Sequence, residues 1–369
     1  MKITFVVQNA NLSGGVRVVA IYAERLHQLG HEVSLISRPK AKPKLKQQLR
    51  SLLKGKGLIQ STQAASHFDN IDPGIPHHIL DKERTLTDLD VPDADVIVAT
   101  WWKTAEEINR LSASKGKKVY FIQQCETHQG QPVERVKATY QLPFHKITIS
   151  QWLVDLMAEE YGDSDTSLIF NSVDGKQFYA PKRTKQDVPT VGMLYKPAFH
   201  KGCDVALKAV AKATQTFPNL KLILFGACDI SGDYPLPEGA EYIKQPEQDK
   251  IKDIYARCDV WLCGSRSEGF HLPPLEAMAC RCPVVSTRVG GPMDIIENGV
   301  NGYLVPVEDD EALANRLVQA LSLSPEDWQS MSDAAYALAT QNTWTTQAKL
   351  FEAALYKAIE EKSLLAVTP

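Results

Sequence analysis

The chain has 369 residues, 44% of them hydrophobic and 23% charged, which is typical of a globular protein large enough for two domains. Its net charge of −3 gives no basic field of the kind that binds nucleic acid, and no apolar run approaches the roughly 18–20 residues of a membrane span. The seven cysteines are dispersed, which favours reduced thiols in the cytoplasm.

Short apolar runs rich in β-branched residues recur along the chain from its first residues. The start is too polar after Val7 for a signal peptide and is interpreted as a first strand. Because the runs are continuously apolar rather than alternating, they predict parallel strands covered by helices on both faces. The predicted strands lie at 2–7, 32–37, 95–100, 118–124, 146–150, 190–195, 221–226, 241–244, 259–263, 283–287 and 302–305.

Segments with helical periodicity separate these strands and give two α/β sets in series. The polar, proline-containing segment Asn171–Thr190 lies between the sets and is interpreted as the hinge. An amphipathic helix is expected at the end of the chain, over 343–362. Helices are also expected at Val16–Leu29, Thr104–Leu111, Trp152–Tyr161, Asp204–Phe217, Asp249–Arg257 and Glu311–Leu323.

The segment Arg38–Gly57 differs from the rest of the chain because it contains eight Lys or Arg residues and no acidic residue. Leucines at 45, 49, 52 and 53 follow helical spacing, so its second half predicts a basic amphipathic helix. Two interpretations remain open. The segment is either a solvated loop or a patch that meets an anionic membrane surface or an anionic acceptor.

Ligands of open α/β sheets bind beyond the carboxyl ends of strands, and two loops occupy such a position. The first loop contains Gly14 and Gly15, which allow free backbone conformation and close approach to a ligand. A helix from Val16 would offer its unpaired N–H groups to an anion, although a simple turn is the alternative. The GxGxxG fingerprint occurs nowhere in the chain, which argues against an NAD-dependent oxidoreductase or a flavin enzyme.

The second loop leads into a helix at Pro273-Pro274, where the missing N–H of a proline costs nothing. Glu268 stands on this loop, and Glu276 is expected in the first helical turn. Glu268 could be a solvated acid, and Glu276 could merely compensate the helix dipole. Alternatively, an ionised carboxylate accepts hydrogen bonds from two vicinal hydroxyls, which a nucleotide ribose and a sugar both offer.

The stretch SEGFHLPPLEAMACRCPVVST, followed by VGGPMDIIENGVNGYLV, resembles the signature of family-four retaining glycosyltransferases. Four further stretches also resemble the family pattern, namely SGGVRVVAIYAERLHQLGHEV, IFNSVDGKQF, VGMLYKPAFHKGCDVALKA and TWTTQAKLF. The resemblance covers most of the chain and is weak from Arg38 to Leu89. It implies the GT-B fold, in which two Rossmann-like domains with parallel sheets face a central cleft. In this fold a C-terminal helix crosses back to the N-terminal domain. We therefore expect an acceptor-side domain at 1–172, completed by 345–369, and a donor domain at 173–344.

The resemblance assigns roles to residues of the donor domain. Glu276 would bind the ribose of the nucleotide, Glu268 the hydroxyls of the donor sugar, and Lys201 the diphosphate. Lys196 stands at the spacing of a family arginine, although a lysine is a point charge without the bidentate fork. His271 replaces a glycine often found there and would add a hydrogen-bond donor near the phosphates. Backbone N–H groups would face the sugar and diphosphate at Gly269, Phe270, His271 and Leu272.

On the acceptor side, His128 in FIQQCETHQG loosely resembles a family histidine near the donor sugar and acceptor. Glu126 and Thr127 are near alternatives, and a hydrogen-bonded surface histidine is the other interpretation. Trp101 and Trp102 end another predicted strand, where an aromatic pair either stacks on acceptor sugars or simply packs.

The resemblance also implies a mechanism without a metal ion. Cleavage at the anomeric carbon leaves a nucleoside diphosphate with additional negative charge, which Lys201, Lys196 and the helix N-terminus would stabilise. No cofactor is expected, because the nucleotide-sugar is a substrate, and no protein nucleophile is assigned. DxD triplets at Asp93–Asp95 and Asp163–Asp165 are interpreted as unrelated to metal binding, since the first leads into a strand and the second lies in an ordinary loop.

The sequence therefore predicts a retaining, metal-independent hexosyltransferase that moves a sugar from a nucleotide-diphosphate donor to a saccharide or lipid-linked acceptor. UDP is the first choice of nucleotide, with GDP and dTDP open. The alternatives are a non-catalytic sugar-nucleotide-binding protein and a sugar-nucleotide epimerase on the same scaffold. We expect a cytoplasmic protein, peripheral at the inner membrane face if Arg38–Gly57 meets lipid, and no nucleic acid partner.

Overall fold

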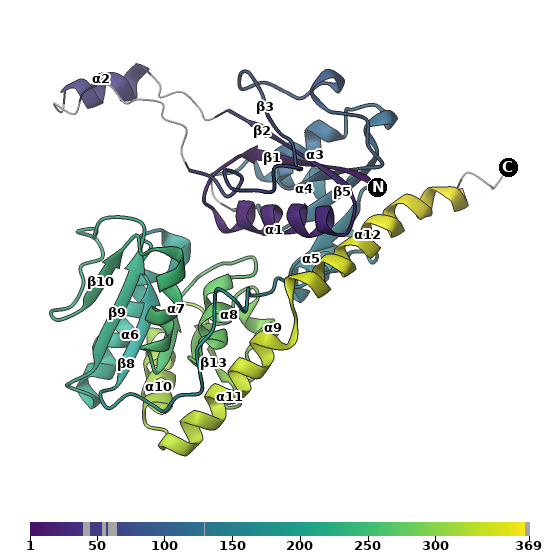
Figure 1. The fold of residues 1–369 in the computed structure, drawn as a ribbon. Coiled ribbons are helices and arrows are strands. Elements are labelled where there is room, and N and C mark those ends of the chain that lie inside the picture. Colours follow the sequence, from purple (N-terminus) through teal and green to yellow (C-terminus); the bar gives the residue numbers. More distant parts are fainter. Residues whose placement is uncertain (40–44, 54–56, 58–64, 129, 366–369) are drawn as a thin grey trace. The chain divides into compact units, whose positions relative to one another are not determined.

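The computed structural model describes residues 1–39, 45–53, 57, 65–128 and 130–365. The chain forms two compact units. Unit 1 comprises Met1–Thr148, Leu153–Ile169 and Ala348–Pro369, and unit 2 comprises Ile149–Trp152 and Phe170–Gln347. Each unit contains its own sheet and its own helices (Figure 1).

Unit 1 is built on a seven-stranded parallel sheet in the order β3-β2-β1-β4-β5-β6-β7. Every residue of β4 and β6 is buried, as expected for continuously apolar strands covered on both faces. The strands are β1 (Lys2–Asn9), β2 (Glu32–Arg38), β3 (His77–Ile79), β4 (Val96–Ala99), β5 (Lys117–Ile122), β6 (His145–Thr148) and β7 (Ser167–Leu168). The helices in this part of the chain are α1 (Gly14–Gln28), α2 (Leu45–Leu53), α3 (Trp102–Ile108), α4 (Val133–Tyr140) and α5 (Gln151–Tyr161).

Unit 2 is built on a six-stranded parallel sheet in the order β10-β9-β8-β11-β12-β13. Its strands are β8 (Thr190–Leu194), β9 (Lys221–Gly226), β10 (Glu241–Lys244), β11 (Val260–Cys263), β12 (Val284–Thr287) and β13 (Gly302–Val305). Its helices are α6 (Cys203–Thr216), α7 (Ile251–Ala256), α8 (Leu272–Ala279), α9 (Pro292–Ile295), α10 (Asp310–Leu321) and α11 (Pro325–Gln341). The chain closes with α12 (Trp344–Leu365).

Every strand predicted from an apolar run is present, and all neighbouring strands are parallel as predicted. The edge strands β3 and β7 are additional, with only three and two residues. The six helices named from periodicity are also present with small shifts at their ends, and α4, α9 and α11 are additional. One shift matters for the site, because α1 begins at Gly14 and not near Val16.

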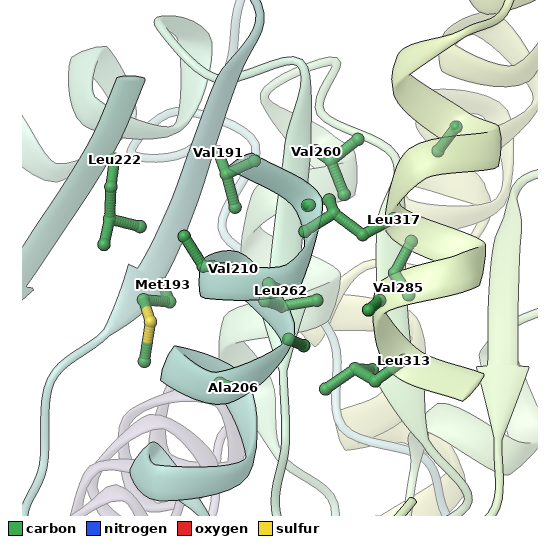
Figure 2. Packing of buried hydrophobic residues seen from close by; sticks show 14 of the residues in the cluster. Val191, Met193, Ala206, Val210, Leu222, Val260, Leu262, Val285, Leu313 and Leu317 are labelled. Atoms are coloured by element: carbon green, nitrogen blue, oxygen red, sulfur yellow. The ribbon is translucent and has the colours of Figure 1, made fainter. Parts of the chain in front are cut away.

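The core of unit 2 explains how its sheet is held against its helices. Val191, Leu262 and Val285 come from three neighbouring strands and are fully or almost fully buried. Val210 of α6 and Leu317 of α10 pack onto this face (Figure 2). Burial of each such side chain stabilises the fold by about 1.5–3 kcal/mol relative to exposure, so the strand ends that hold the candidate site are rigidly supported.

The basic segment Arg38–Gly57 contains the predicted helix, α2, although its residues 40–44 and 54–56 lie outside the described residues. Leu49, Leu52 and Leu53 are 53%, 49% and 87% exposed, so half or more of this apolar surface faces solvent. Across the described helices, none has the length and apolar composition needed to cross a bilayer.

The closing helix α12 packs on unit 1, as the resemblance implied. Phe351 is fully buried, stacks on Tyr22 at 4.5 Å between ring centroids, and meets Phe121 edge-on at 5.1 Å. A polar contact adds to this, because the His31 ring nitrogen Nε2 lies 2.7 Å from Oε1 of Glu352. The last helix is therefore part of the hydrophobic core formed by the first strands and helix of the chain.

Replacing Phe351 with alanine is expected to lower the free energy of unfolding by about 3–5 kcal/mol, because it leaves an aromatic-sized cavity between α12 and α1. Urea denaturation measures this loss. Leu350→Ala, on the same helix but 52% exposed, is the control and is expected to cost less than about 1 kcal/mol. Equal losses in the two variants would contradict the docking of α12 through Phe351.

Candidate functional site

The predicted donor-site residues of unit 2 lie beyond the carboxyl ends of two adjacent strands. β8 ends at Leu194 and is followed by Lys196 and the short 3-10 helix η3 (Phe199–Lys201). β11 ends at Cys263 and is followed by the loop 264–271, which precedes α8. Because β8 and β11 are hydrogen-bonded neighbours, their two loops emerge at the same edge of the sheet.

Glu268 is 7% exposed and is surrounded by hydrogen-bond donors. Lys201 Nζ donates to both carboxylate oxygens at 2.8 Å, and Ser265 Oγ donates to Oε1 at 2.8 Å. Burial alone would raise the pKa of Glu268, but His271 when its ring is protonated, together with Lys201 and Ser265, outweighs burial and brings the pKa below its ordinary value. The carboxylate is therefore ionised at neutral pH, which is the state that accepts hydrogen bonds from hydroxyls.

Two lysines give this edge of the sheet a local positive charge. The Lys201 side chain is 18% exposed and reaches Glu268. Partial burial and the nearby Lys201 lower the pKa of Lys196, and Glu268 partly offsets this effect. The two ammonium groups are thus close enough to influence each other. Such a pair favours an anion with more than one charge, as a diphosphate has.

His271 links the Glu268 loop to α8 and has an unusual backbone conformation. It occupies the N-cap position with φ 68° and ψ 75°, in the left-handed region that glycine adopts most easily. Its side chain is 5% exposed, and Nε2 lies 3.7 Å from Oε1 of Glu268. Nδ1 is buried without a hydrogen-bond partner among the described residues. Burial lowers the pKa of His271 to about 4, so the ring is neutral at pH 7.

The predicted anion-binding amides come from the end of the loop and from Leu272, the first residue of α8. Pro273 and Pro274 are the second and third residues of α8 and have no N–H to offer. Of the described residues, none accepts a hydrogen bond from the four consecutive N–H groups of 269–272. Four adjacent donors at a helix N-terminus form a site suited to phosphate or carboxylate oxygens.

The expectation that Glu276 lies in the first turn of its helix is wrong. α8 begins at Leu272, which makes Glu276 the fifth residue, and its first turn contains no acid. Tyr255 Oη donates to Glu276 Oε2 at 3.0 Å, and both side chains are buried. The Tyr255 ring packs edge-on against Trp261 at 4.5 Å. An aromatic cluster therefore orients this carboxylate, and dipole compensation does not account for it.

Two glycines bring the loops of the site close together, and the sequence analysis assigned them no role. Gly202 follows Lys201 with φ 55°, and a Cβ there would lie 1.7 Å from the carbonyl oxygen of Gly264. Gly290 has φ 46°, and a Cβ there would lie 2.3 Å from the carbonyl oxygen of Gly269. A side chain at either position would force the Lys201 or Glu268 segment outward.

Arg266 ties the two loops together from the side. Its guanidinium donates to both carboxylate oxygens of Asp204, at 2.8 and 2.7 Å, and to the carbonyl oxygen of Phe199 at 2.7 Å. It also stacks over the Phe199 ring at 4.2 Å. Because η3 ends at Lys201, this bidentate pair fixes the backbone that presents the lysine. Like Tyr255, Gly202 and Gly290, Arg266 supports the site and was not among the residues predicted from the sequence.

Gly14 and Gly15 belong to unit 1, at the start of α1. Neither has a positive φ, so the conformational freedom expected of them is not used. A Cβ on Gly14 would meet nothing within 4 Å, and a Cβ on Gly15 would make only ordinary contact with Gln123 at 3.5 Å. Gln123 Nε2 donates to the Gly15 carbonyl at 3.2 Å, which joins this turn to the loop after β5. The missing side chains leave open space beside a helix start.

The loop after β5 contains His128, which is exposed, and Glu126, which is not. Glu126 Oε2 accepts hydrogen bonds from the Trp102 N–H at 2.9 Å and from Tyr120 Oη at 3.4 Å. Trp102 is buried and 5.1 Å from the Trp101 ring, so Trp102 packs inside unit 1 and only Trp101 is partly accessible. Among the residues predicted in this loop, Glu126 is the one whose carboxyl group is held by hydrogen bonds inside unit 1.

The acids of both DxD triplets are engaged by basic or backbone groups. Asp93 pairs with the Lys115 ammonium, and the Lys2 backbone N–H donates to Asp95. Asp163 pairs with Lys146, and Asp165 pairs with Lys357. Throughout the part of the chain that the structure describes, no group of three or more His, Cys, Asp or Glu side chains is arranged to hold a metal ion.

Comparison with known families finds a match over the part of the chain that holds the site. Residues 176–338 match the family model described as glycosyl transferases group 1, and this range includes Lys196, Lys201, Glu268 and Glu276. The D-inositol 3-phosphate glycosyltransferase of Corynebacterium urealyticum is 30% identical over 165 residues, which are 40% of this chain and 38% of that protein. The curated relatives among which it is found are matched over only 11% to 40% of their own length.

Solved structures resemble the chain over nearly its whole length. Sucrose-phosphate synthase from Thermosynechococcus elongatus superposes with a TM-score of 0.73 at 18% identity, covering 100% of both chains. Anabaena HepE, crystallised in complex with UDP-glucose, gives a TM-score of 0.71 at 19% identity, covering 97% of this chain and 100% of its own. The fold is therefore GT-B, as the resemblance implied.

Glu126 is expected to make the stability of unit 1 depend on pH. Burial raises the pKa of Glu126 to about 8, despite the hydrogen bonds from Trp102 and Tyr120. Above its ordinary pKa, the unfolded carboxyl has lost a proton that the folded one keeps, so stability falls as pH rises toward about 8. Urea denaturation at several pH values should show a smaller fall in Glu126→Gln. The exposed Glu134→Gln is the control, and an unchanged slope in Glu126→Gln would contradict the assignment.

Proposed function

We propose that this chain, which has the GT-B fold and matches the group 1 glycosyl transferase model over residues 176–338, is a retaining glycosyltransferase. It transfers a sugar from a nucleotide-diphosphate donor to a hydroxyl of a saccharide or lipid-linked acceptor. The observation that supports this most strongly is the group formed by Glu268, Lys201 and the amides of 269–272, which have no acceptor among the described residues. This group combines an ionised acceptor of hydroxyls with a cationic site for phosphate oxygens.

The donor is bound in three parts by unit 2. Glu276, oriented by Tyr255, accepts the ribose hydroxyls of the nucleotide. Lys201, Lys196 and the loop amides bind the diphosphate, and Glu268 accepts hydroxyls of the sugar. The buried position of both glutamates favours this assignment, because a buried polar group that loses its partner is costly and so discriminates strongly between ligands.

The reaction is driven by stabilisation of the leaving diphosphate. As the bond to the anomeric carbon breaks, negative charge grows on the phosphate oxygens, and Lys201, Lys196 and the amides are already in place beside them. This provides the charge compensation that a divalent ion would otherwise supply, so we propose a metal-independent reaction. Removal of one such donor from an enzyme typically costs about 2.7–4 kcal/mol of transition-state stabilisation.

UDP is the proposed nucleotide, and unit 1 is proposed to contribute to acceptor and donor contacts. The Anabaena HepE structure contains UDP-glucose on the same fold, which supports UDP before GDP or dTDP. Gly14 and Gly15 leave room at the start of α1 for a ligand to approach the backbone. His128, exposed on the loop after β5, is the proposed polar contact near the sugar.

A peripheral membrane contact through α2 is proposed for the lipid-linked acceptor class. The segment Arg38–Gly57 contains basic residues without acids, and leucines of α2 are exposed beside them. A helix with exposed apolar residues and a basic surround binds anionic lipid by insertion and by charge attraction. This contact would bring the enzyme to an acceptor held in the inner membrane face.

Glu276→Ala is expected to weaken UDP binding at least about tenfold, because the ribose loses hydrogen bonds to a charged acceptor worth about 1.5–3 kcal/mol. Calorimetric titration in buffer containing EDTA measures the affinity. Glu297→Ala, an exposed acid of unit 2, is the matched control. Unchanged UDP affinity in Glu276→Ala would remove the ribose assignment.

A thermal-shift comparison of UDP, GDP and dTDP sugars identifies the donor. Wild-type turnover that is lost in EDTA and restored by magnesium would remove the metal-free mechanism.

The chain is expected to co-sediment with phosphatidylserine vesicles at low salt and to be released as salt screens the basic segment. The double variant Leu49→Ser and Leu53→Ser should lose most of this binding. Leu89→Ser, at a leucine that is 99% exposed elsewhere in unit 1, should retain it. Absence of binding by the wild type would leave α2 as a solvated helix.

A further inference from the structure

Lys201 has two roles in the proposed function that compete for its hydrogen bonds. It is proposed to bind the diphosphate, yet its ammonium donates to both oxygens of Glu268. Both side chains are largely buried, at 18% and 7% exposure, so water cannot readily replace either partner. The ammonium has three N–H donors and gives two of them to Glu268, so contact with more than one diphosphate oxygen takes at least one of these two away, and Glu268 then needs a substitute.

We propose that Lys201 exchanges Glu268 for the diphosphate when the donor binds, and that His271 replaces it by donating from Nε2 to the Glu268 carboxylate. This inference rests on the proposed function and makes His271 a positioning residue that acts through Glu268. His271 thereby has a role at the loop position where the family that the sequence resembles often has a glycine.

The geometry of His271 suits this exchange. Nε2 lies 3.7 Å from Oε1 of Glu268, a few tenths of an ångström beyond hydrogen-bond distance, so a small movement closes the contact. Nδ1 is buried and has no partner within the described part of the chain. A buried lone pair without a partner is tolerated better than a buried N–H, and the nearby carboxylate attracts a proton, so the neutral ring has its proton on Nε2.

The other groups near Glu268 do not provide the same replacement. Ser265 supplies a single hydroxyl, which already donates to Oε1. Burial raises the pKa of the Cys263 thiol, which is neutral and a weak donor. Lys196, like Lys201, is a cation that the incoming phosphates attract. Without His271, the carboxylate would stay ionised in the complex only with difficulty, because burial favours its neutral form.

The backbone of His271 supports a role for its side chain. Its φ of 68° is strained for any residue with a Cβ, and glycine would adopt it without strain. A side chain kept on a strained backbone and buried with Nε2 facing a site carboxylate is more economically explained by a ligand-dependent contact than by packing alone.

The test is the number of protons taken up when UDP binds, measured by calorimetry in two buffers of different ionisation enthalpy. His271→Phe keeps an aromatic ring and the backbone strain but removes the N–H. In this variant Glu268 loses Lys201 without a replacement, its pKa rises on UDP binding, and up to about one proton more than in the wild type is taken up. His271→Gln places an N–H near the position of Nε2 and should restore the wild-type count.

Turnover provides a second measurement on the same variants. Because the ionised form of Glu268 is the active one, kcat of His271→Phe should fall with decreasing pH at a higher pH than kcat of the wild type. A purely structural role of His271 would lower kcat equally at all pH values.

The outcomes separate this inference from the proposed function. UDP binding with the same proton uptake in the wild type and in His271→Phe overturns the exchange and leaves the glycosyltransferase assignment intact. Failure of the folded wild type to bind UDP, GDP or dTDP overturns the proposed function and the exchange with it. Excess uptake in His271→Phe, reversed in His271→Gln, supports the exchange.

Discussion

The ion pair between Lys201 and Glu268 joins two segments that are 67 residues apart, and the proposed donor site depends on it. A largely buried ion pair is a poor source of stability, since desolvation offsets much of the attraction. It can form only because the backbone is held by other contacts, namely the close crossing at Gly202 and the Arg266–Asp204 pair. The fold thus supports a charged site that adds little to stability, which is the pattern expected of a functional site.

Much of this site follows from sequence reasoning because its geometry comes from the sheet. Parallel strands are legible as continuous apolar runs, and the ends of neighbouring strands must lie at one edge. Glu268 and Lys201 each follow such a strand, so their meeting is a consequence of the order in which β8 and β11 pair. The strand order itself, and short edge strands such as β3, leave no comparable mark in the sequence.

The details that sequence reasoning did not reach depend on contacts between distant segments. Tyr255 orients Glu276 from 21 residues away, and nothing in the local sequence indicates that pairing. The raised pKa of Glu126 is a property of its burial, which the loop sequence alone does not fix. The wrong prediction that Glu276 lies in the first helical turn has a simpler cause. Proline is tolerated at several first-turn positions, so it marks the start of a helix only to within a residue or two.

The packing of α12 in unit 1 affects how the protein folds while it is being synthesised. The first amine of the chain contacts His31, whose other ring nitrogen contacts Glu352 near the end of the chain. On the ribosome, all residues of unit 2 emerge before those that complete unit 1, although unit 1 is begun first. The aromatic cluster around Tyr22 therefore stays incomplete until Phe351 is synthesised, and a premature stop shortly before α12 would damage unit 1, most of whose residues precede unit 2 in the chain.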